Sequence, residues 1–341
     1  MSDLPRDFNH SRFQPGTTAG FYESYFQRAN HPTRPLAFWI RYTIFCPKGR
    51  PHDAIGELWA IWFDGERNRH SVAKSEFGAG RFVFGREEMS ARIGDAVLEP
   101  GGLQGAAESR GHRIAWDLSY SGDAAPLFLL PPGLYAGGFP KAKTLVGLPM
   151  ARYDGTVTVD GAAMDIEGWR GSQNHNWGVK HTDRYAWGQV AGFDNAPDSF
   201  LEVATGQLKI GPAWTPRMTP LVLRHEGEEF ALRSLWQAVA RARGSFGPGH
   251  NPGQKMFHWD FASRGRGIEV EGRISAPKDA FVGLRYHNPP GGAKQCLNSK
   301  IASCRLQVRR AGQPAQTLET TSRAAFEILT DDLAHGIEIR T

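Results

Sequence analysis

Hydrophobic and polar residues alternate along much of this chain with a period of two, not the ~3.6 of a helix. Within residues 112–120 the large apolar side chains share one face: Ile114, Trp116, Leu118 and Tyr120. Residues 268–275 repeat the pattern, with apolar positions opposite charged ones. Such alternation is typical of strands that have one buried face and one solvated face.

Two segments are apolar on both faces. Residues 36–46 and 55–63 are almost continuously hydrophobic, which is typical of central strands covered on both sides. Gly, Pro, Asn and Asp separate the other predicted strands, which are 156–160, 185–193, 200–205, 221–227, 256–262, 281–287 and 303–308.

Helical periodicity is scarce. Residues 234–243 predict one short helix with Leu235, Val239 and Ala242 on a common face, and residues 87–93 predict a weaker one. No Gly-rich turn joins a strand to a helix, which argues against a Rossmann or P-loop nucleotide site. Many short strands with frequent turns and very little helix predict an all-β protein, a sandwich or barrel.

A length of 341 residues favours two domains over one. The Gly- and Pro-rich stretch 206–220 is the best boundary, because a new run of strands follows it. We therefore expect an N-terminal tail at 1–20 and domains at 21–210 and 211–341. Residues 245–255 are expected to form a long surface loop.

The net charge of +5 permits an anionic partner without requiring one. Basic residues are scattered and no nucleic-acid motif accompanies them, so we expect no nucleic-acid partner. The oligomeric state stays open.

The three cysteines, Cys46, Cys296 and Cys304, form no disulfide framework and are expected to be buried thiols. No apolar run reaches the ~18–20 residues of a membrane span, and the N-terminus lacks the apolar stretch of a signal peptide. We therefore expect a cytoplasmic protein without stable membrane insertion.

The densest chemistry lies in residues 168–194. On an extended strand, Gln173, His175 and Trp177 point to one side, and Asn174 points to the other with Asn176. The next strand places Tyr185, Trp187 and Gln189 on one face, and Phe200 and Glu202 follow on another strand. These strands predict a pocket that contains an imidazole, a carboxylate and several aromatic rings.

Such a pocket suits acid catalysis on an olefin. Burial keeps a carboxyl or imidazole group in the protonation state that proton transfer needs. Aromatic faces stabilise the resulting cation by roughly 0.5–2 kcal/mol each. Excluding water gives cyclisation or isomerisation, and admitting it at one point gives hydration.

Other interpretations remain open. Trp177 and Trp187 also suit a solid core, and the Asn residues suit a turn that bonds its own backbone. His175, His181 and Asp183 are metal-ligand types, but their spacing matches no well-defined site, so we expect no metal.

Three segments resemble the superfamily of tocopherol cyclase, carotenoid 1,2-hydratase (hydroxyneurosporene synthase) and the AttH-like proteins. Residues 20–30 look like the family's first strand, with Glu23 followed by aromatic residues. QNHNWG at 173–178 is similar to the family's short polar run that ends in Asn-Trp-Gly. YAWGQVAGFD at 185–194 follows at the expected place, and the resemblance covers most of 20–341.

The resemblance implies two lipocalin-like β-barrel domains packed together, an apolar pocket for a lipid-like or terpenoid substrate, and chemistry that needs no cofactor. In the carotenoid hydratases the proposed acid is an Asp preceded two residues earlier by Tyr, downstream of His-x-Trp. His175 and Trp177 match His-x-Trp. The downstream pair here is Phe200 and Glu202, which departs from the pattern at both positions but keeps a carboxylate.

We therefore expect a cofactor-independent hydratase, cyclase or isomerase that acts by acid catalysis on an apolar isoprenoid- or polyketide-like molecule. Glu202 or Asp194 would be the acid, and His175 would orient water or share the proton. The expected substrate-binding residues are Gln173, Asn174, Trp177, Tyr185, Trp187 and Phe200. The alternative is a non-catalytic lipocalin-like carrier of a hydrophobic ligand.

Overall fold

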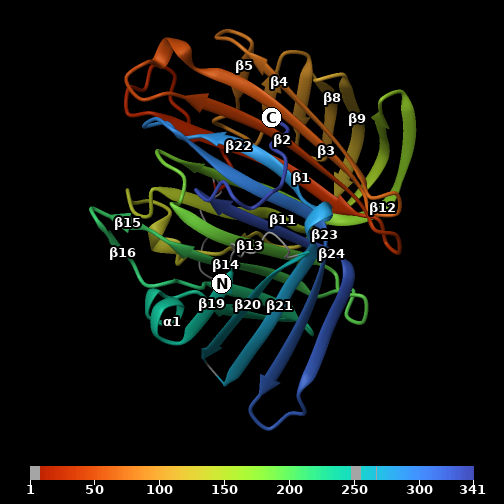
Figure 1. Ribbon diagram of the computed structural model, residues 1–341, viewed down its shortest axis with the longest axis vertical. Coiled ribbons are helices and arrows are strands. Elements are labelled where there is room, and N and C mark those ends of the chain that lie inside the picture. The colour runs from red at the N-terminus through yellow and green to blue at the C-terminus, as the bar shows by residue number, and fades with distance from the viewer. Residues whose placement is uncertain (1–7, 247–254, 266) are drawn as a thin grey trace.

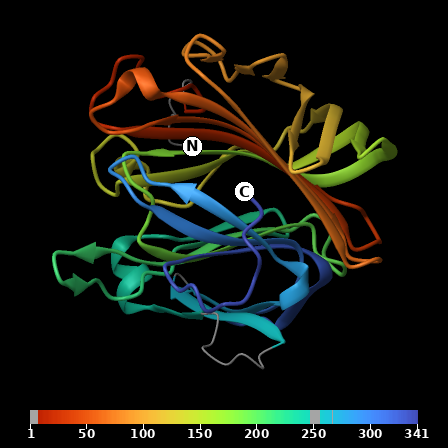
Figure 2. The same cartoon turned by 45° about the horizontal axis from the view of Figure 1, so that its top comes forward.

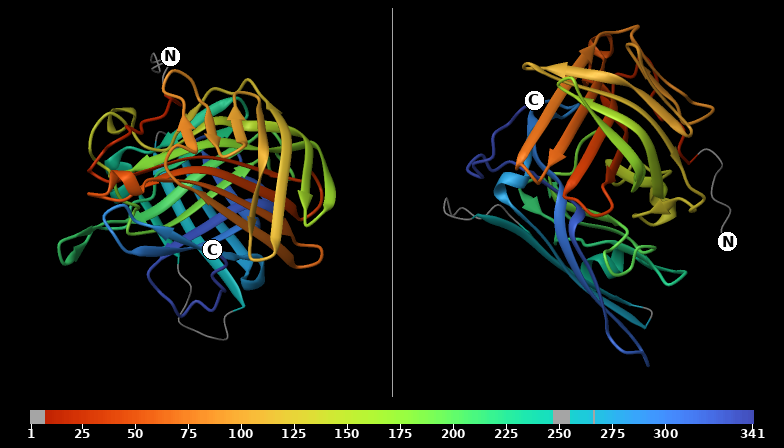
Figure 3. Two further views of the ribbon diagram at one scale, coloured as in Figure 1. Left: turned by 90° about the horizontal axis from the view of Figure 1, so that it is seen from above. Right: turned by 90° about the vertical axis from the view of Figure 1, so that its right-hand side faces the viewer.

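The computed structural model describes residues 8–246, 255–265 and 267–341, and these residues are mostly β-strand. Two large antiparallel sheets, one from each half of the chain, form two stacked layers (Figures 1 and 2). The right-hand view of Figure 3 separates the layers most clearly. The expected all-β, lipocalin-like fold is confirmed.

The first sheet has the hydrogen-bonded order β4-β3-β2-β1-β12-β11-β9-β8-β7-β6-β5, and β10 pairs with β11. Its strands are β1 (Phe21–Asn30), β2 (Leu36–Cys46), β3 (Ile55–Asp64), β4 (Arg69–Phe77), β5 (Phe82–Phe84), β6 (Ala91–Ile93), β7 (Ala96–Glu99), β8 (Gly102–Ser109), β9 (His112–Ser121), β10 (Leu127–Phe128), β11 (Ala142–Val159) and β12 (Ala162–Gly178).

The second sheet has the order β18-β17-β14-β13-β24-β23-β21-β20-β19, and β22 pairs with β23. Its strands are β13 (Arg184–Ala191), β14 (Phe200–Gln207), β17 (Leu221–His225), β18 (Glu228–Leu232), β19 (Ala242–Phe246), β20 (Met256–Gly265), β21 (Ile268–Pro277), β22 (Val282–His287), β23 (Ala293–Arg310) and β24 (Gln316–Thr330). A small hairpin, β15 (Lys209–Ile210) and β16 (Ala213–Trp214), projects from the sheet, and three short 3-10 turns span Pro51–Asp53, Pro132–Leu134 and Lys278–Ala280.

Strands β1 and β2 have two buried faces, as their apolar sequences predict. On β1, Tyr25 packs into the core of the first sheet, whereas its neighbour Phe26 packs into the core shared with the second sheet. On β2, Phe38 packs into the core of the first sheet, and Trp39 packs into the core shared with the second sheet. Consecutive residues of these strands therefore serve different cores, and the second face carries the contact between the sheets.

The sheets divide the chain earlier than expected. Strands β13 and β14 belong to the second sheet, so membership changes at 179–183 and not at 210. The Gly- and Pro-rich stretch 206–220 contains the β15–β16 hairpin instead of a linker. Turn-forming residues mark a reversal of the chain equally well within a domain and between domains.

The short helix differs from its predicted form. It spans α1 (Leu235–Ala240), and β19 begins at Ala242. Ala238 is its buried residue, whereas Leu235 and Val239, predicted to share an apolar face with Ala242, are exposed. Ser234 and Gln237 form a capping box, so local capping sets this turn. Residues 87–93 form no helix, and β6 occupies their end.

The expected tail at 1–20 is in part attached to the first sheet, because Ser11 and Phe13 are buried. Most of the expected loop at 245–255 lies outside the described residues. The three cysteines are buried and unbridged, as predicted. No helix in the described part of the chain is long and apolar enough to span a bilayer.

Replacing Gly171 with Ala should destabilise the protein. A Cβ at this position on β12 would collide with the backbone carbonyl of Arg28 on β1. We expect a loss of roughly 1–3 kcal/mol in the free energy of unfolding measured with urea. Gly78→Ala is the control, because nothing lies within 4 Å of its Cβ. Equal stability of the two variants would contradict the close approach of β1 and β12.

Candidate active site

A cavity of about 200 Å³ lies between the two sheets. Residues of β1 and β2 form one wall, and residues of β13, β14, β22 and β24 form the opposite wall. The segment 129–144 and α1 supply further lining, including the exposed Phe139 and Leu235. Asn176, His181 and Arg233 also line the cavity. Its walls are strongly aromatic, with Tyr22, Phe26, Trp39, Tyr185, Trp187 and Tyr286.

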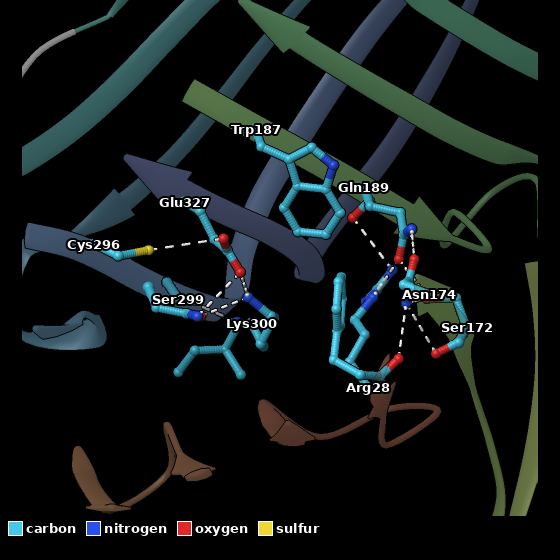
Figure 4. A network of polar contacts seen from close by, with 12 residues as sticks. Arg28, Ser172, Asn174, Trp187, Gln189, Cys296, Ser299, Lys300 and Glu327 are labelled. Atoms are coloured by element: carbon cyan, nitrogen blue, oxygen red, sulfur yellow. Dashed lines mark hydrogen bonds and ion pairs between the residues drawn. The ribbon is translucent and has the colours of Figure 1, made fainter. Parts of the chain in front are cut away.

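A buried polar network lies beside the aromatic wall and joins the two sheets. Arg28 Nε on β1 donates to Gln189 Oε1 on β13 at 2.7 Å, and Ser172 Oγ donates to the same oxygen at 2.6 Å. Gln189 Nε2 donates to Asn174 Oδ1 at 2.9 Å and to Glu202 Oε2 at 2.7 Å. All five side chains are buried, so Gln189 links the Arg28 guanidinium of the first sheet to the Glu202 carboxyl group of the second. Figure 4 shows Arg28, Ser172, Asn174 and Gln189 of this network.

Glu202 is the acid of this network. It is 1% exposed, and Trp187 Nε1 donates to its Oε1 at 2.8 Å. Burial raises the pKa of Glu202 to about 7, and the hydrogen bonds from Trp187 and Gln189 oppose that rise. Near neutral pH this carboxyl group therefore keeps a proton for part of the time, as a general acid requires.

A second carboxyl group, Glu327, lines the cavity from β24. Lys300 Nζ donates to its Oε1 at 2.7 Å, and Asn298 Nδ2 donates to the same atom at 3.0 Å. In the strand register, Trp187 pairs with Glu327 on one side of β13, and Gln189 pairs with Glu202 on the other. Figure 4 shows the Trp187 ring between the Glu327 group and the Arg28 network.

His181 also lines the cavity, between two tyrosines. Its ring centroid lies 4.0 Å from that of Tyr22 and 5.6 Å from that of Tyr286. Burial, followed by repulsion from Arg41, lowers the pKa of His181 to about 3. At neutral pH it is therefore an uncharged hydrogen-bonding group.

The structure places His175 and Trp177 on the opposite face of β12. His175 Nε2 lies 2.8 Å from Glu23 Oε1, and the imidazole packs between the rings of Tyr25 and Trp177. Burial lowers the pKa of His175, so the neutral ring donates to the Glu23 carboxylate. The predicted alternation is correct. Neither ring lines the cavity, however, because the cavity lies on the face of β12 that carries Asn176.

The other predicted site residues fall in four places. Tyr185 and Trp187 line the cavity, and Asn174 lies in the Arg28 network. Gln173 bonds Asn9 on the His175 side, and Phe200 packs in a separate apolar cluster.

Asp194 lies away from the cavity lining, in the segment that follows β13. It forms an ion pair with Arg323 at 2.6 Å. Burial acts to raise the pKa of Asp194, but hydrogen bonds from Thr321 and Arg323 lower it, so this carboxylate is a poor acid at neutral pH.

The three candidate metal ligands are separated. His175 bonds Glu23, His181 stacks on Tyr22, and Asp183 pairs with Lys180. No cluster of three His, Cys, Asp or Glu side chains suited to a metal occurs within 8–246, 255–265 and 267–341.

A larger groove of about 1160 Å³ lies elsewhere, between the β3–β4 turn and the C-terminal segment. Several of its charged side chains are paired with one another: Arg67 with Asp64, His112 with Asp160 and Arg340 with Glu338. We therefore take the smaller aromatic cavity as the candidate site.

Sequence reasoning missed Arg28, Arg41, Lys300 and Glu327. The available signal was a charged residue inside an otherwise apolar strand, as Arg41 stands within LAFWIRYTIFC. Such residues are rarely buried without a partner, so they mark polar sites between packed layers.

No protein-family model matches this chain. An uncharacterized protein of Mycobacterium tuberculosis, found in two strains, is 25% identical over 297 residues, which cover 85% of this chain and 82% of its own length.

Three solved structures share the fold. Kievitone hydratase from Nectria haematococca is 11% identical with a TM-score of 0.57, covering 96% of this chain and 94% of its own. CghA is 13% identical with a TM-score of 0.56, covering 96% and 95%. A protein of Nitrosomonas europaea assigned as AttH is 12% identical with a TM-score of 0.56, covering 91% of each chain. At these identities the likeness establishes the fold, which is the coarser part of the expected resemblance.

Replacing Glu202 with Gln should remove a pH-dependent loss of stability. Because the folded state raises this pKa from 4.5 to about 7, the native protein binds the proton more tightly, and stability falls as pH rises across that interval. The variant should gain roughly 2–3 kcal/mol relative to the wild type between about pH 5 and about pH 8, at about 1.4 kcal/mol for each tenfold change in proton affinity. Urea unfolding at both pH values measures it, with exposed Glu87→Gln as control. The same difference in stability between Glu202→Gln and the wild type at pH 5 and at pH 8 would contradict the raised pKa of Glu202.

Replacing Glu23 with Ala should release the N-terminal segment. The Glu23 carboxylate accepts hydrogen bonds from Ser11 Oγ and from the backbone N–H groups of Arg12 and Phe13 at 2.7, 2.7 and 2.8 Å. Losing these bonds should cost roughly 2–5 kcal/mol and accelerate hydrogen exchange at the two amides. Ser11→Ala, which keeps the carboxylate, should have a smaller effect. Normal protection in Glu23→Ala would rule out this anchoring role.

Proposed function

We propose that this protein is a hydratase, cyclase or isomerase that acts by acid–base catalysis on a small, largely apolar molecule in the cavity between the sheets, without a cofactor. One observation carries the proposal: two buried carboxyl groups, Glu202 and Glu327, flank Trp187 in different electrostatic surroundings. Unlike environments that separate the protonation states of two carboxyl groups are how enzymes assign an acid and a base.

Glu202 is assigned the role of proton donor. Its pKa of about 7 leaves a protonated fraction at neutral pH, and it occupies the same face of β14 as the cavity-lining Ala204 and Gly206. Glu327 is assigned the opposite role, because Lys300 and Asn298 both donate to its carboxylate and it lines the cavity itself. It would accept a proton from the substrate or from an attacking water.

The aromatic walls suit the charge that protonation creates. Adding a proton to a carbon–carbon double bond leaves a cation, and the faces of Trp187, Tyr185 and Tyr286 stabilise it without attacking it. Capture by water gives hydration, and capture by another group of the same molecule gives cyclisation. Hydration is also the reaction in the name of one structural neighbour.

His175 and Asp194 receive no catalytic step in this proposal. His175 holds Glu23 on the other face of β12, and Asp194 holds Arg323 near the surface. Both are assigned to stabilising the fold.

The alternative function, a carrier of a hydrophobic ligand, has one observation in its favour. Both carboxyl oxygens of Glu202 accept hydrogen bonds from Trp187 and Gln189, and Glu202 does not line the cavity. In a carrier, Glu202 would hold the wall in place and no product would form.

The test uses conjugated small molecules that quench tryptophan fluorescence on binding, incubated with the protein in heavy-oxygen water. Mass spectrometry distinguishes hydration, which adds a labelled oxygen, from cyclisation or isomerisation, which leave the mass unchanged. Glu202→Gln should lower kcat roughly 100- to 10,000-fold with little change in KM. Because the acid form is lost as pH rises, kcat/KM of the wild type should fall above about pH 7.

Glu228→Gln, an exposed carboxylate on β18, is the matched control and should keep full activity. Full activity in Glu202→Gln would remove this residue from the mechanism. Binding without any product in the wild type would support the carrier.

A further inference from the structure

Three cavity-lining residues carry buried polar atoms with no hydrogen-bond partner in the described part of the chain. These atoms are Trp39 Nε1, Arg41 Nε and Asn176 Oδ1. Trp39 is 1% exposed and Arg41 is 4% exposed. Leaving such a group unsatisfied destabilises the folded protein, and more so for a charged group, so a cluster of three around one cavity points to a polar ligand group.

The three residues belong to one patch of the cavity wall. Trp39 and Arg41 are two positions apart on β2 and therefore share a face. Arg41 Nη2 donates to Ser24 Oγ on β1 at 2.7 Å, and Ser24 lies directly across from Asn176 in the strand register. Arg41 and Asn176 thus meet around Ser24.

Aromatic rings hold the Arg41 guanidinium in place. Its Cζ lies 4.7 Å from the ring centroid of Tyr286 and 5.9 Å from that of Trp39. A planar guanidinium fixed in this way presents donors in a set geometry that suits a carboxylate or another acidic oxygen.

The charges around the cavity favour an anion. Arg41, Lys143 and Arg233 are the basic residues of the lining, and Glu327 is its one acidic residue. Glu327 is already paired with buried Lys300 at 2.7 Å, and His181 is uncharged at neutral pH. The lining therefore keeps an excess of positive charge.

The size of the cavity limits the ligand. An engineered cavity of roughly 150 Å³ holds one benzene molecule, so about 200 Å³ accommodates one ring with a short substituent. The aromatic walls suit a flat, conjugated body.

We propose that the cavity binds a single-ring conjugated acid, a carboxylic acid or an acidic phenol or enol. Its acidic oxygen accepts hydrogen bonds from Arg41 Nε and Trp39 Nε1, and a hydroxyl or N–H group of the ligand donates to Asn176 Oδ1. This inference rests on the proposed function only in using the same cavity, and it names the substrate class that the cavity selects.

The test compares cinnamate with cinnamamide, its neutral isostere, by isothermal titration calorimetry. The wild type should bind cinnamate at least tenfold more tightly. Arg41→Gln should abolish that preference, and Arg41→Lys, which keeps the charge but lacks Nε, should retain part of it. Arg285→Gln is the matched control, because Arg285 is exposed on the opposite face of β22 and should bind like the wild type. Thermal melts confirm that each variant is folded.

Equal affinity of the wild type for the acid and the amide, or no binding of either at millimolar concentration, would overturn the inference. Loss of preference in Arg285→Gln as well would also overturn it, because the effect would then not belong to Arg41. Charge-selective binding by a protein that converts no ligand would refute the proposed catalysis and leave this inference standing. Turnover of neutral molecules with no preference for acids would refute this inference and leave the proposed catalysis standing.

Discussion

The buried guanidinium of Arg28 is the interaction on which the arrangement of the two sheets depends. It extends from β1 of the first sheet to Gln189 on β13 of the second, and also binds Asn30 at 2.6 Å. Burial, partly offset by attraction to Glu202, lowers the pKa of Arg28 to about 10, so it remains charged at neutral pH. Removing one partner of such a buried group leaves an uncompensated charge, which is far more costly than losing a surface ion pair. This contact therefore fixes the position of the two sheets relative to each other.

This constraint also shapes the cavity chemistry. The side-chain oxygen of Gln189 accepts from Arg28 and its nitrogen donates to Glu202. The position of the Glu202 carboxyl group in the second sheet therefore depends on that of Arg28 in the first. Burial of Glu202 between the sheets raises its pKa. On the other side of Trp187, Glu327 accepts a hydrogen bond from Lys300. The fold alone supports many functions. The proposed acid–base pair comes instead from this asymmetry between two carboxyl groups.

The strands were predictable because their signal is local. β2 matches its predicted range, and the burial of both its faces follows from an unbroken apolar run. The alternation of His175 with Asn174 and Asn176 was also predictable, but alternation does not say which of two buried faces contains the cavity. That choice depends on the second sheet, which packs against the Phe26 and Trp39 side. Glu327 and Lys300, distant in sequence from the polar run at 173–178, join the site through the pairing of β24 with β13 and with β23. The predicted extent and face of the short helix were wrong, because the capping box of Ser234 and Gln237 sets this turn and a few periodic residues do not outweigh it.

The most direct test of this account is the titration of the Glu202 carboxyl group itself. Infrared difference spectra between the wild type and Glu202→Gln isolate its protonated C=O band. The account predicts that this band disappears with a midpoint near pH 7, because the carboxyl group is buried between the sheets. A midpoint near the ordinary value of 4.5 would show a solvated carboxylate and would contradict the proposed acid.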